Sequence, residues 1–550
     1  MKLLSNLKSL VIKSLNNKRL IGIAVILVIT IFGVRFIIGG HAATPSSSIS
    51  ASSGTLSGQT SIQKDSSGNY VNFGPSFNYG FDFSDAGPDY NTMPYQDSAA
   101  KLNYNPAVDS AKLVLAKFSG SFMDVSINGF GSQTDPQDSQ CNPRTTPPYN
   151  VCSPVAVADS TNTDISSIKS RIKIVTDANG EPVITLVQAP AWMYLPANCP
   201  NGLAGNINGN LDENFNTTTT PFTLPPCPDN YPAFASLSAY IAKSFPQVKH
   251  FVVWSEVRDF YNPAAKVYDA ASYTALYNDV YTAIKKVRPD AQVGGPYAAL
   301  SADPCPITPA CNTISTLSGT YGYVNQIMLD VLKYWLQNKT GADFLAVDGG
   351  TEIAKANNSK GDGTITDPLT SSEKYAFVDK WIESQTGYNN LPIWWMESHI
   401  APSFGLDSNG TTIPCLPDSM PSGTTCWSDA QGAAARIATL ILMNSSGATV
   451  GMQWQAQSQA DWPDEGLWTS TQLSNGTGGQ ATVLANDLGI ALPVLNQRLT
   501  RINGQPTGVI AASESSKLIL VNTLNTTQTA TVNNTSISLN PDEVKVIALP

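Results

Sequence analysis

Short apolar runs alternate with longer amphipathic stretches between about residues 75 and 498. A short apolar run predicts a buried strand, whereas apolar residues three or four positions apart predict a helix that packs on one face. The clearest predicted strands are residues 183–187, 250–254, 291–296, 344–347, 392–396 and 448–454. The clearest predicted helices are residues 272–287, 324–338, 372–383 and 431–443. Strands and helices that alternate in this way indicate an α/β fold with a parallel sheet.

The number of strand–helix repeats distinguishes a (β/α)8 barrel from a doubly wound sheet. About eight strand–helix rounds in roughly 400 residues favour a (β/α)8 barrel with long loops over a doubly wound sheet. No glycine-rich phosphate loop follows the predicted strands, which also argues against a nucleotide-binding fold. We therefore predict a TIM barrel over residues 75–500.

The composition changes after Arg501. Residues 508–549 are rich in Val, Ile, Thr and Asn, lack aromatic residues, and contain alternating runs at 517–521 and 543–547. Such alternation predicts short antiparallel strands. Residues 501–550 are therefore expected to form a small β domain with a structural role.

The N-terminus has the charge pattern of a membrane-targeting segment. Residues 1–19 carry five basic groups and no acidic group, and residues 20–39 are almost wholly apolar. The apolar segment is about long enough to cross a bilayer, and its basic flank favours a cytoplasmic N-terminus with the body outside. An uncleaved signal anchor in the cell membrane is favoured, and a signal peptide cleaved near residues 40–43, which releases a secreted protein, stays open. Residues 40–74 are a Ser/Thr/Gly-rich spacer in either case.

Charge and composition exclude several kinds of partner. The first 43 residues hold six of the 32 Lys and Arg and none of the 42 Asp and Glu, so the remainder has a net charge of −16. An acidic surface repels phosphate backbones, and we expect no nucleic-acid partner. The chain has three His residues and no GxSxG motif, and the oxygen-rich residues 206–212 do not match an EF-hand loop. We therefore expect neither a metal nor a cofactor.

The eight cysteines fall in four local pairs. These are Cys141/Cys152, Cys199/Cys227, Cys305/Cys311 and Cys415/Cys426. None forms a CxxC motif, which argues against zinc and redox sites. Nearest-neighbour disulfides are one hypothesis among many connectivities. Disulfides in loops would place the body in an oxidising compartment.

Two glutamates follow apolar runs at the ends of predicted strands. Glu256 ends the run VVWSE, and Glu397 ends IWWME. Barrel enzymes place catalytic groups at the carboxyl ends of their strands. Two carboxyl groups that face each other among indole rings can have their pKa values pushed apart, so that one is an acid and the other a nucleophile. This layout suits hydrolysis of a glycosidic bond, although a strand-end glutamate taken alone is more often part of a salt bridge.

Three longer stretches resemble one family of enzymes. They are VVWSEVRDFY (252–261), the segment 272–297 that ends in AQVGGPY, and the segment 327–351, which leads to PIWWMES (392–398). Together, over residues 75–550, they resemble the retaining glycoside hydrolases of clan A, and within it family 39, which includes β-xylosidases and α-iduronidases. The resemblance implies a (β/α)8 barrel with a C-terminal β domain, a carbohydrate substrate and no cofactor.

The resemblance also implies a role for each glutamate. Glu256 would be the general acid/base and Glu397 the nucleophile. Clan members usually carry Asn directly before the acid/base, where it hydrogen-bonds the sugar 2-OH, whereas this chain has Ser255. A hydroxyl is shorter and has one donor instead of two, so the contact is lost or passes through water. This departure predicts slow turnover, an unusual sugar or a relative without catalysis.

Five further residues are candidates for substrate binding. Trp192, after the third predicted strand, and Trp454, on the eighth, are placed to stack on a sugar face, although core packing suits both equally well. Tyr297 and Asp348 stand at the ends of the fifth and sixth strands, where they would bind substrate hydroxyls. His399 would hydrogen-bond the nucleophile or the substrate, and a structural role is as plausible.

Two tryptophans precede the catalytic candidates by two positions. Trp254 and Trp395 should lie on the same side of their strands as Glu256 and Glu397, because residues two apart share a face of a strand. We expect both rings to pack in the barrel interior rather than to line a sugar subsite.

Three functions remain in competition. The leading hypothesis is an extracytoplasmic retaining glycosidase that acts on a poly- or oligosaccharide by double displacement. The second is a catalytically inactive barrel that binds glycan at the cell surface, and the third is a structural envelope protein without a ligand. The sugar, the anomer, exo or endo action and the oligomeric state are not indicated by the sequence.

Overall fold

The structure is a computed structural model in two compact units, divided between Asn72 and Phe73. It describes residues 61–65, 68–72, 76–82, 106–125, 165–187, 189–190, 193, 210–211, 217–218, 225–262, 267–300, 315–319, 322–350, 368–399, 404–406, 412–414, 428–454, 456–457, 466–469 and 478–549. Of the first unit it describes one antiparallel hairpin, β1 (Ser61–Asp65) with β2 (Gly68–Asn72).

The predicted membrane segment, residues 20–39, lies outside the described residues. Within the described part of the chain, no helix has the length and apolar character needed to span a membrane. The predicted anchor or signal peptide therefore stays a prediction.

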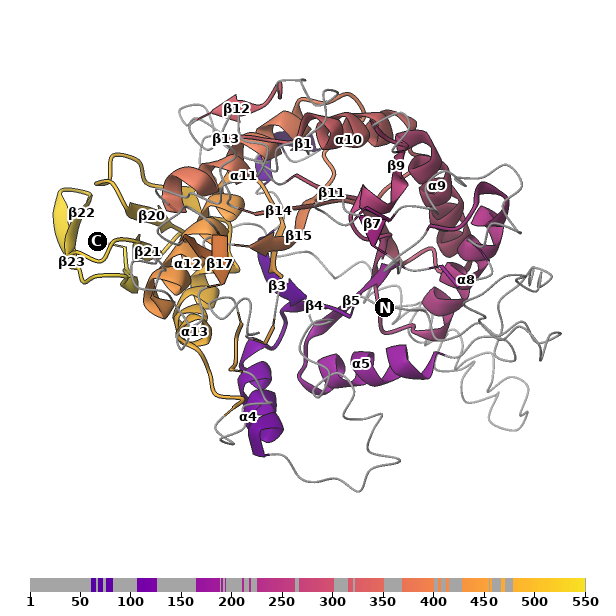
Figure 1. The fold of residues 1–550 in the computed structure, drawn as a ribbon. Helices are drawn as coiled ribbons and strands as arrows, with labels where there is room; N and C mark the ends of the chain where they lie inside the picture. The colour runs from indigo at the N-terminus through magenta and orange to yellow at the C-terminus, as the bar shows by residue number, and fades with distance from the viewer. Residues whose placement is uncertain are drawn as a thin grey trace, which may run out of the picture. The chain divides into compact units, whose positions relative to one another are not determined.

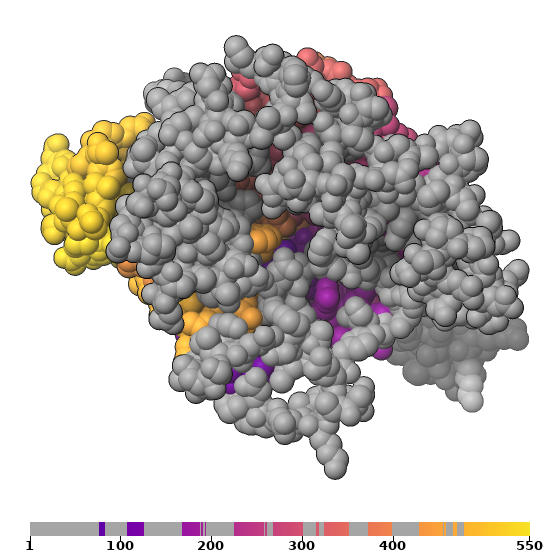
Figure 2. Space-filling view, viewed as in Figure 1, coloured from indigo at the N-terminus to yellow at the C-terminus, as the bar shows by residue number. Residues whose placement is uncertain are grey.

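Eight parallel strands form a closed barrel in the second unit, as the sequence predicts (Figure 1). In chain order they are β3 (Asn78–Asp82), β4 (Phe122–Asp124), β5 (Glu181–Leu186), β8 (His250–Val253), β11 (Gln292–Ala299), β14 (Phe344–Gly350), β15 (Ile393–His399) and β18 (Val450–Gln453). Each pairs with the next, and β18 closes the ring by pairing in parallel with β3. The space-filling view shows described segments from the first (indigo) and last (orange) parts of the barrel sequence close together on the visible face (Figure 2).

A helix follows each barrel strand in the described chain. The helices are α4 (Pro106–Leu115), α5 (Ser166–Asp177), α8 (Tyr231–Ser244), α9 (Ala270–Val287), α10 (Gln326–Asn338), α11 (Pro368–Glu383), α12 (Asp429–Ser446) and α13 (Val483–Leu495). Side-chain caps fix several of their starts. Asp269 accepts a hydrogen bond from the Ser272 backbone N–H at 2.9 Å, and Asn325 accepts one from Ile327 at 3.0 Å. These caps satisfy backbone donors that the first turn of a helix leaves unpaired.

Among the described residues, one cluster of ten buried apolar side chains fills the barrel interior. They are Phe122, Val183, Val252, Tyr297, Phe344, Ala346, Trp394, Met396, Val450 and Met452. The rings of Phe344 and Trp394 stack with centroids 4.1 Å apart, and His250 lies 5.0 Å from the Trp394 ring. Large side chains fill the barrel to its axis here, so the barrel is a packed core rather than a pore.

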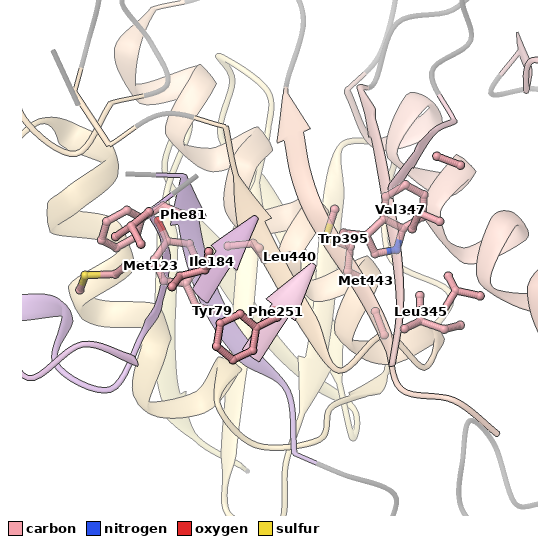
Figure 3. Packing of buried hydrophobic residues seen from close by; sticks show 14 of the residues in the cluster. Tyr79, Phe81, Met123, Ile184, Phe251, Leu345, Val347, Trp395, Leu440 and Met443 are labelled. Carbon is pink, nitrogen blue, oxygen red and sulfur yellow. The ribbon is translucent and has the colours of Figure 1, made fainter. Parts of the chain in front are cut away.

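The outer faces of the strands pack on the helices, and here one prediction is wrong. Trp254 and Trp395 are fully buried, but they belong to the outer core with helix residues such as Phe234 and Tyr375. Figure 3 shows Trp395 in this cluster beside labelled residues of β14 and α12. Strand alternation is correct for the tryptophans themselves, but the backbone after each of them departs from it, as described below.

The C-terminal strands form a separate antiparallel sheet. It has the order β19 (Thr500–Arg501), β20 (Val509–Ser513), β21 (Lys517–Asn522) and β24 (Val544–Ala548). A hairpin of β22 (Gln528–Val532) with β23 (Thr535–Leu539) completes the module, which lies beside α12 and α13 (Figure 1). Five of its apolar residues belong to the core that the barrel helices share: Ile510, Ala512, Ile519, Val521 and Val544.

A close approach between α4 and the segment before α13 requires glycine. Gly479 has a φ of +75°, and a Cβ there would lie 1.8 Å from the carbonyl oxygen of Ala107. Gly479→Ala should lower the free energy of unfolding by about 3 kcal/mol, because it adds a steric clash to the left-handed backbone cost. Gly504→Ala is the matched control: its φ is +80°, but no atom lies within 4 Å, so about 1 kcal/mol is expected. Equal losses in urea unfolding of the two variants would contradict the clash.

Cys227 is the one cysteine among the described residues, and it is disulfide-bonded. The other seven lie outside the described residues, so the proposed pairing stays a prediction.

Candidate active site

The structure brings Glu256 and Glu397 together at the carboxyl ends of the fourth and seventh barrel strands. One carboxylate oxygen from each, and one from Asp348 on the sixth strand, all lie within 4.8 Å of one another. The two glutamates are half-buried, while Asp348 is 2% exposed. Three residues that the sequence singled out separately therefore form one cluster.

A β-bulge directs Glu397 toward this cluster. Val347 of β14 pairs with Trp395, but the next residue, Asp348, pairs with Glu397, so Met396 is the extra residue. Without the bulge, Glu397 would share the outward face of Trp395. The extra residue shifts the alternation by one, and bulges commonly re-aim a side chain beside an active site.

Three non-glycine residues around the cluster have left-handed backbone. The φ angles are +66° at Trp254, +33° at Glu256 and +57° at Tyr297. Each costs of order 1–3 kcal/mol and persists only where the surroundings hold it. Trp254 is held by a hydrogen bond from its indole N–H to Asp259 (3.0 Å) and from its backbone N–H to the Leu186 carbonyl (2.9 Å). Because such strain gathers at functional sites, it supports a functional role for these strand ends.

Tyr297 lies buried amid the carboxylates. Burial raises the pKa of its phenol well above the ordinary value, and the negative charges of neighbouring carboxylates raise it further. These carboxylates belong to Glu397, Asp348, Asp124 and Asp82. The phenol therefore keeps its proton at any physiological pH and is available as a hydrogen-bond donor.

Two carboxylates near Tyr297, Asp82 and Asp124, were not predicted. They end the first two barrel strands and are almost fully buried. Asp124 accepts hydrogen bonds from the Thr185 hydroxyl (2.5 Å) and backbone N–H (3.2 Å). The signal that would have found them is the one used for the glutamates, an acidic residue directly after the short apolar runs FNYGF and SFM.

Side chains from the surrounding helices bind the carbonyl groups of these irregular strand ends. The Tyr273 hydroxyl donates to Val253 O, and the Tyr375 hydroxyl donates to Gly349 O, both at 2.8 Å. Lys374, fully buried, donates to Gly350 O. Buried carbonyl groups need such partners where ladder hydrogen bonds stop. Side chains of α9 and α11 thus support the strand ends of the site from the outer side of the barrel.

The structure describes only some of the remaining residues that the sequence predicts to bind substrate. Ser255 is half-buried between Trp254 and Glu256, and Trp454 is partly exposed directly after β18. The backbone of His399 ends β15, but its side chain lies outside the described residues, as does all of Trp192. The substrate-binding roles of all these residues stay predictions.

The oxygens of Glu256, Asp348 and Glu397 also have the chemistry of ligands for a hard divalent cation. Carboxylates gathered at this distance are equally suited to acid/base work. The expectation of a metal-free site therefore stays a prediction.

Another buried carboxyl group, that of Asp379, supports the Glu397 strand from the helix side. Asp379 of α11 accepts a hydrogen bond from the Trp395 indole N–H at 3.0 Å and another from the Ser446 hydroxyl. Burial raises the pKa of Asp379 to about 7; the charge of Glu383 adds to the rise, while the two hydrogen bonds and the charge of Arg498 oppose it.

This shift predicts a pH-dependent effect of Asp379→Asn. Between pH 4 and 7 the folded protein keeps a proton that the unfolded chain loses, so stability falls as pH rises through this window. Asparagine has no proton to lose and keeps one acceptor and one donor for the two partners. We expect the variant to match the wild type near pH 4 and to be more stable by about 2–4 kcal/mol at pH 8. Thermal unfolding measured from pH 4 to pH 8 checks this, with Asp177→Asn at an exposed position as the control. The same pH dependence in both variants would contradict a raised pKa of Asp379.

Comparison with known proteins gives structural neighbours only. No protein-family model and no curated protein matches the chain. A family 39 glycoside hydrolase from Bacteroides cellulosilyticus WH2 is similar over 86% of this chain and 81% of its own, with 14% identity and a TM-score of 0.49. The family 39 enzyme of Xanthomonas axonopodis pv. citri covers 82% and 71% (13% identity, TM-score 0.44), and a monomeric β-xylosidase of Caulobacter crescentus CB15 covers 82% and 74% (14%, 0.43). Solved family 39 structures are thus among the neighbours.

Proposed function

We propose that this protein hydrolyses glycosidic bonds of a poly- or oligosaccharide with retention of configuration. The observation that carries the proposal is the approach of the Glu256 and Glu397 carboxylate oxygens to within 4.8 Å at the carboxyl end of the barrel. Retaining glycosidases hold their two carboxyl groups about 5–5.5 Å apart, whereas inverting ones leave about 6.5–9.5 Å for a water molecule. The short separation supports direct attack by one carboxylate.

The two glutamates would act in two steps. In the first, Glu397 attacks the anomeric carbon while Glu256 gives its proton to the departing glycosidic oxygen, which leaves as an alcohol. In the second, Glu256 takes a proton from water, whose oxygen displaces Glu397 from the anomeric carbon. Glu256 is thereby protonated again and Glu397 is free, so both groups return to their starting states.

The neighbouring groups have roles that follow from their chemistry. Tyr297, protonated and buried beside Glu397, would donate a hydrogen bond that orients the nucleophile or a sugar hydroxyl. Asp348 would accept a hydrogen bond from a substrate hydroxyl. Ser255 has a single donor for the sugar, which supports turnover below that of enzymes with an amide at this position.

A substrate screen with stereochemical analysis tests the proposal. Purified protein would be incubated with 4-nitrophenyl α- and β-glycosides of the common pentoses and hexoses and with plant and microbial polysaccharides. The first-formed anomer would be assigned by proton NMR. We expect retained configuration and no loss of rate on addition of EDTA. Inverted configuration would withdraw the nucleophile role from Glu397, and a requirement for a divalent cation would withdraw the metal-free mechanism.

The competing function is glycan binding without turnover, which Ser255 favours. The same protein on a glycan array distinguishes the two. Binding that survives Glu397→Gln, with no product from any substrate, would establish the binding function in place of hydrolysis. If the protein shows neither glycan binding nor turnover, a structural role in the envelope is the function that remains.

The same proposal includes a location outside the cytoplasm, either tethered to the membrane by residues 20–39 or secreted. The charge pattern of the N-terminus and the disulfide at Cys227 support it. Protease added to intact cells should degrade a tethered body while a cytoplasmic marker survives. If residues 75–550 resist the protease as well as the cytoplasmic marker does, a location outside the cytoplasm is contradicted.

A further inference from the structure

Arg436 is a buried cation that contacts the residue after Glu397. It lies on α12 and is 1% exposed. One of its guanidinium nitrogens, Nη1, donates to the carbonyl oxygen of Ser398 at 2.7 Å and to the Ser398 hydroxyl oxygen at 2.8 Å. The carbonyl and the hydroxyl of the residue next to the glutamate are therefore bound by one side chain.

Ser398 connects two barrel strands. Its hydroxyl donates to Met452 O on β18 at 2.6 Å, and its carbonyl also accepts from the Trp454 backbone N–H at 3.2 Å. Ser398 lies two residues beyond Met396, the extra residue of the bulge that directs Glu397 inward. A bulge leaves part of the ladder unpaired, so the direction of Glu397 depends on what holds the residues beside it.

The charge of Arg436 also reaches Tyr79 of β3, which lies in the core between the barrel strands and the helices. Burial raises the pKa of the Tyr79 phenol well above its ordinary value, and the positive charge of Arg436 partly opposes the rise. Tyr79 in turn donates to the Gln453 side-chain oxygen at 2.5 Å on the last barrel strand. Burying a guanidinium costs several kcal/mol unless its surroundings compensate, so an arginine here is not explained by space filling.

We propose that Arg436 is a positioning residue that fixes the direction of the Glu397 carboxylate through Ser398. The expected effect on kcat rests on the proposed hydrolase function. The expected effect on the position of Glu397 does not. A planar guanidinium can hold the carbonyl and the hydroxyl oxygen in fixed directions, which a flexible ammonium group does less well. A nucleophile displaced by about 1 Å loses about 100-fold in rate, because attack requires an aligned approach.

The test compares Arg436→Met and Arg436→Lys with a matched arginine elsewhere in the barrel. Arg288, 9% exposed, likewise donates to backbone carbonyl oxygens, those of Ala242, Phe245, Pro246 and Val248. It directly follows α9 in the short loop that leads to β11, at the opposite end of the strands from the site. Arg288→Met should lower the melting temperature and leave kcat and KM of the folded protein unchanged.

For Arg436→Met we expect kcat to fall about 10- to 100-fold with KM nearly unchanged, because the lost interaction acts on the transition state. Arg436→Lys should recover part of kcat. If both variants keep wild-type kcat and lose only stability, Arg436 is merely structural and the proposal is wrong.

A crystal structure of Arg436→Met gives a readout that does not need a substrate. We expect the Glu397 carboxylate to move by more than about 0.5 Å relative to Glu256, the tolerance within which catalytic groups act. An unmoved Glu397 overturns the positioning role even if the wild-type protein proves inactive. A displaced Glu397 in an inactive protein supports the positioning role and contradicts the proposed function alone.

Discussion

Glu397→Ala is expected to lower kcat by at least about 10⁴-fold, because the first chemical step then has no nucleophile. Sodium azide should restore turnover, since the small anion fits the space that the carboxylate leaves and attacks the anomeric carbon itself. The product would be a glycosyl azide with the configuration opposite to that of the substrate. Steady-state kinetics with and without azide, followed by NMR of the product, measure both effects.

The control for this variant is Glu373→Gln. Glu373 lies on α11, pairs with Arg501 at 2.6 Å and is not one of the clustered carboxylates. Its replacement should leave kcat within about twofold of the wild type, because a partly exposed ion pair contributes little. If Glu397→Ala retains a tenth or more of the activity, another group is the nucleophile.

Glu256→Ala should give a loss that depends on the leaving group. Substrates with a sugar or alcohol leaving group need a proton from the acid, and their kcat/KM should fall about 10²–10⁴-fold. A 2,4-dinitrophenyl glycoside needs no proton to depart, so its kcat/KM should change little. Its kcat should still fall, because the glycosyl-enzyme then waits for water without a general base.

Azide separates the roles of the two glutamates. With Glu256→Ala, azide would attack the glycosyl-enzyme and give a glycosyl azide with the same configuration as the substrate. Opposite configurations from the Glu397 and Glu256 variants would establish the order of the two carboxyl groups in the reaction. A uniform loss across all leaving groups would withdraw the acid/base role from Glu256.

Local sequence was sufficient to predict the barrel and the place where Glu256 and Glu397 meet. The runs at 250–254 and 392–396 are largely apolar stretches, as strands covered by helices require. Glu397 directly follows the second run, and Glu256 follows the first after Ser255. The structure has strands at His250–Val253 and Ile393–His399 and brings the two glutamates together. The rule that strand ends meet at one face of a barrel was enough to expect this.

The directions of individual side chains needed the structure. Strict alternation placed Trp395 and Glu397 on one face, but the extra residue Met396 separates them. A bulge depends on hydrogen bonds with the neighbouring strand, which the sequence of one strand does not contain. Arg436 was missed for a similar reason, since an arginine within the alanine-rich run of α12 gives no local sign that it reaches Ser398 on another element.

The shared core of the C-terminal sheet and the barrel helices has a consequence for biosynthesis. Val544 of β24 belongs to the same core as residues of α12 and α13. Domains generally fold as units while the chain emerges from the N-terminus onward. Here the apolar faces of α12 and α13 stay uncovered until β24 has left the ribosome. A stop codon before β24 would therefore leave a barrel with an exposed core, rather than an intact barrel that lacks an appendage.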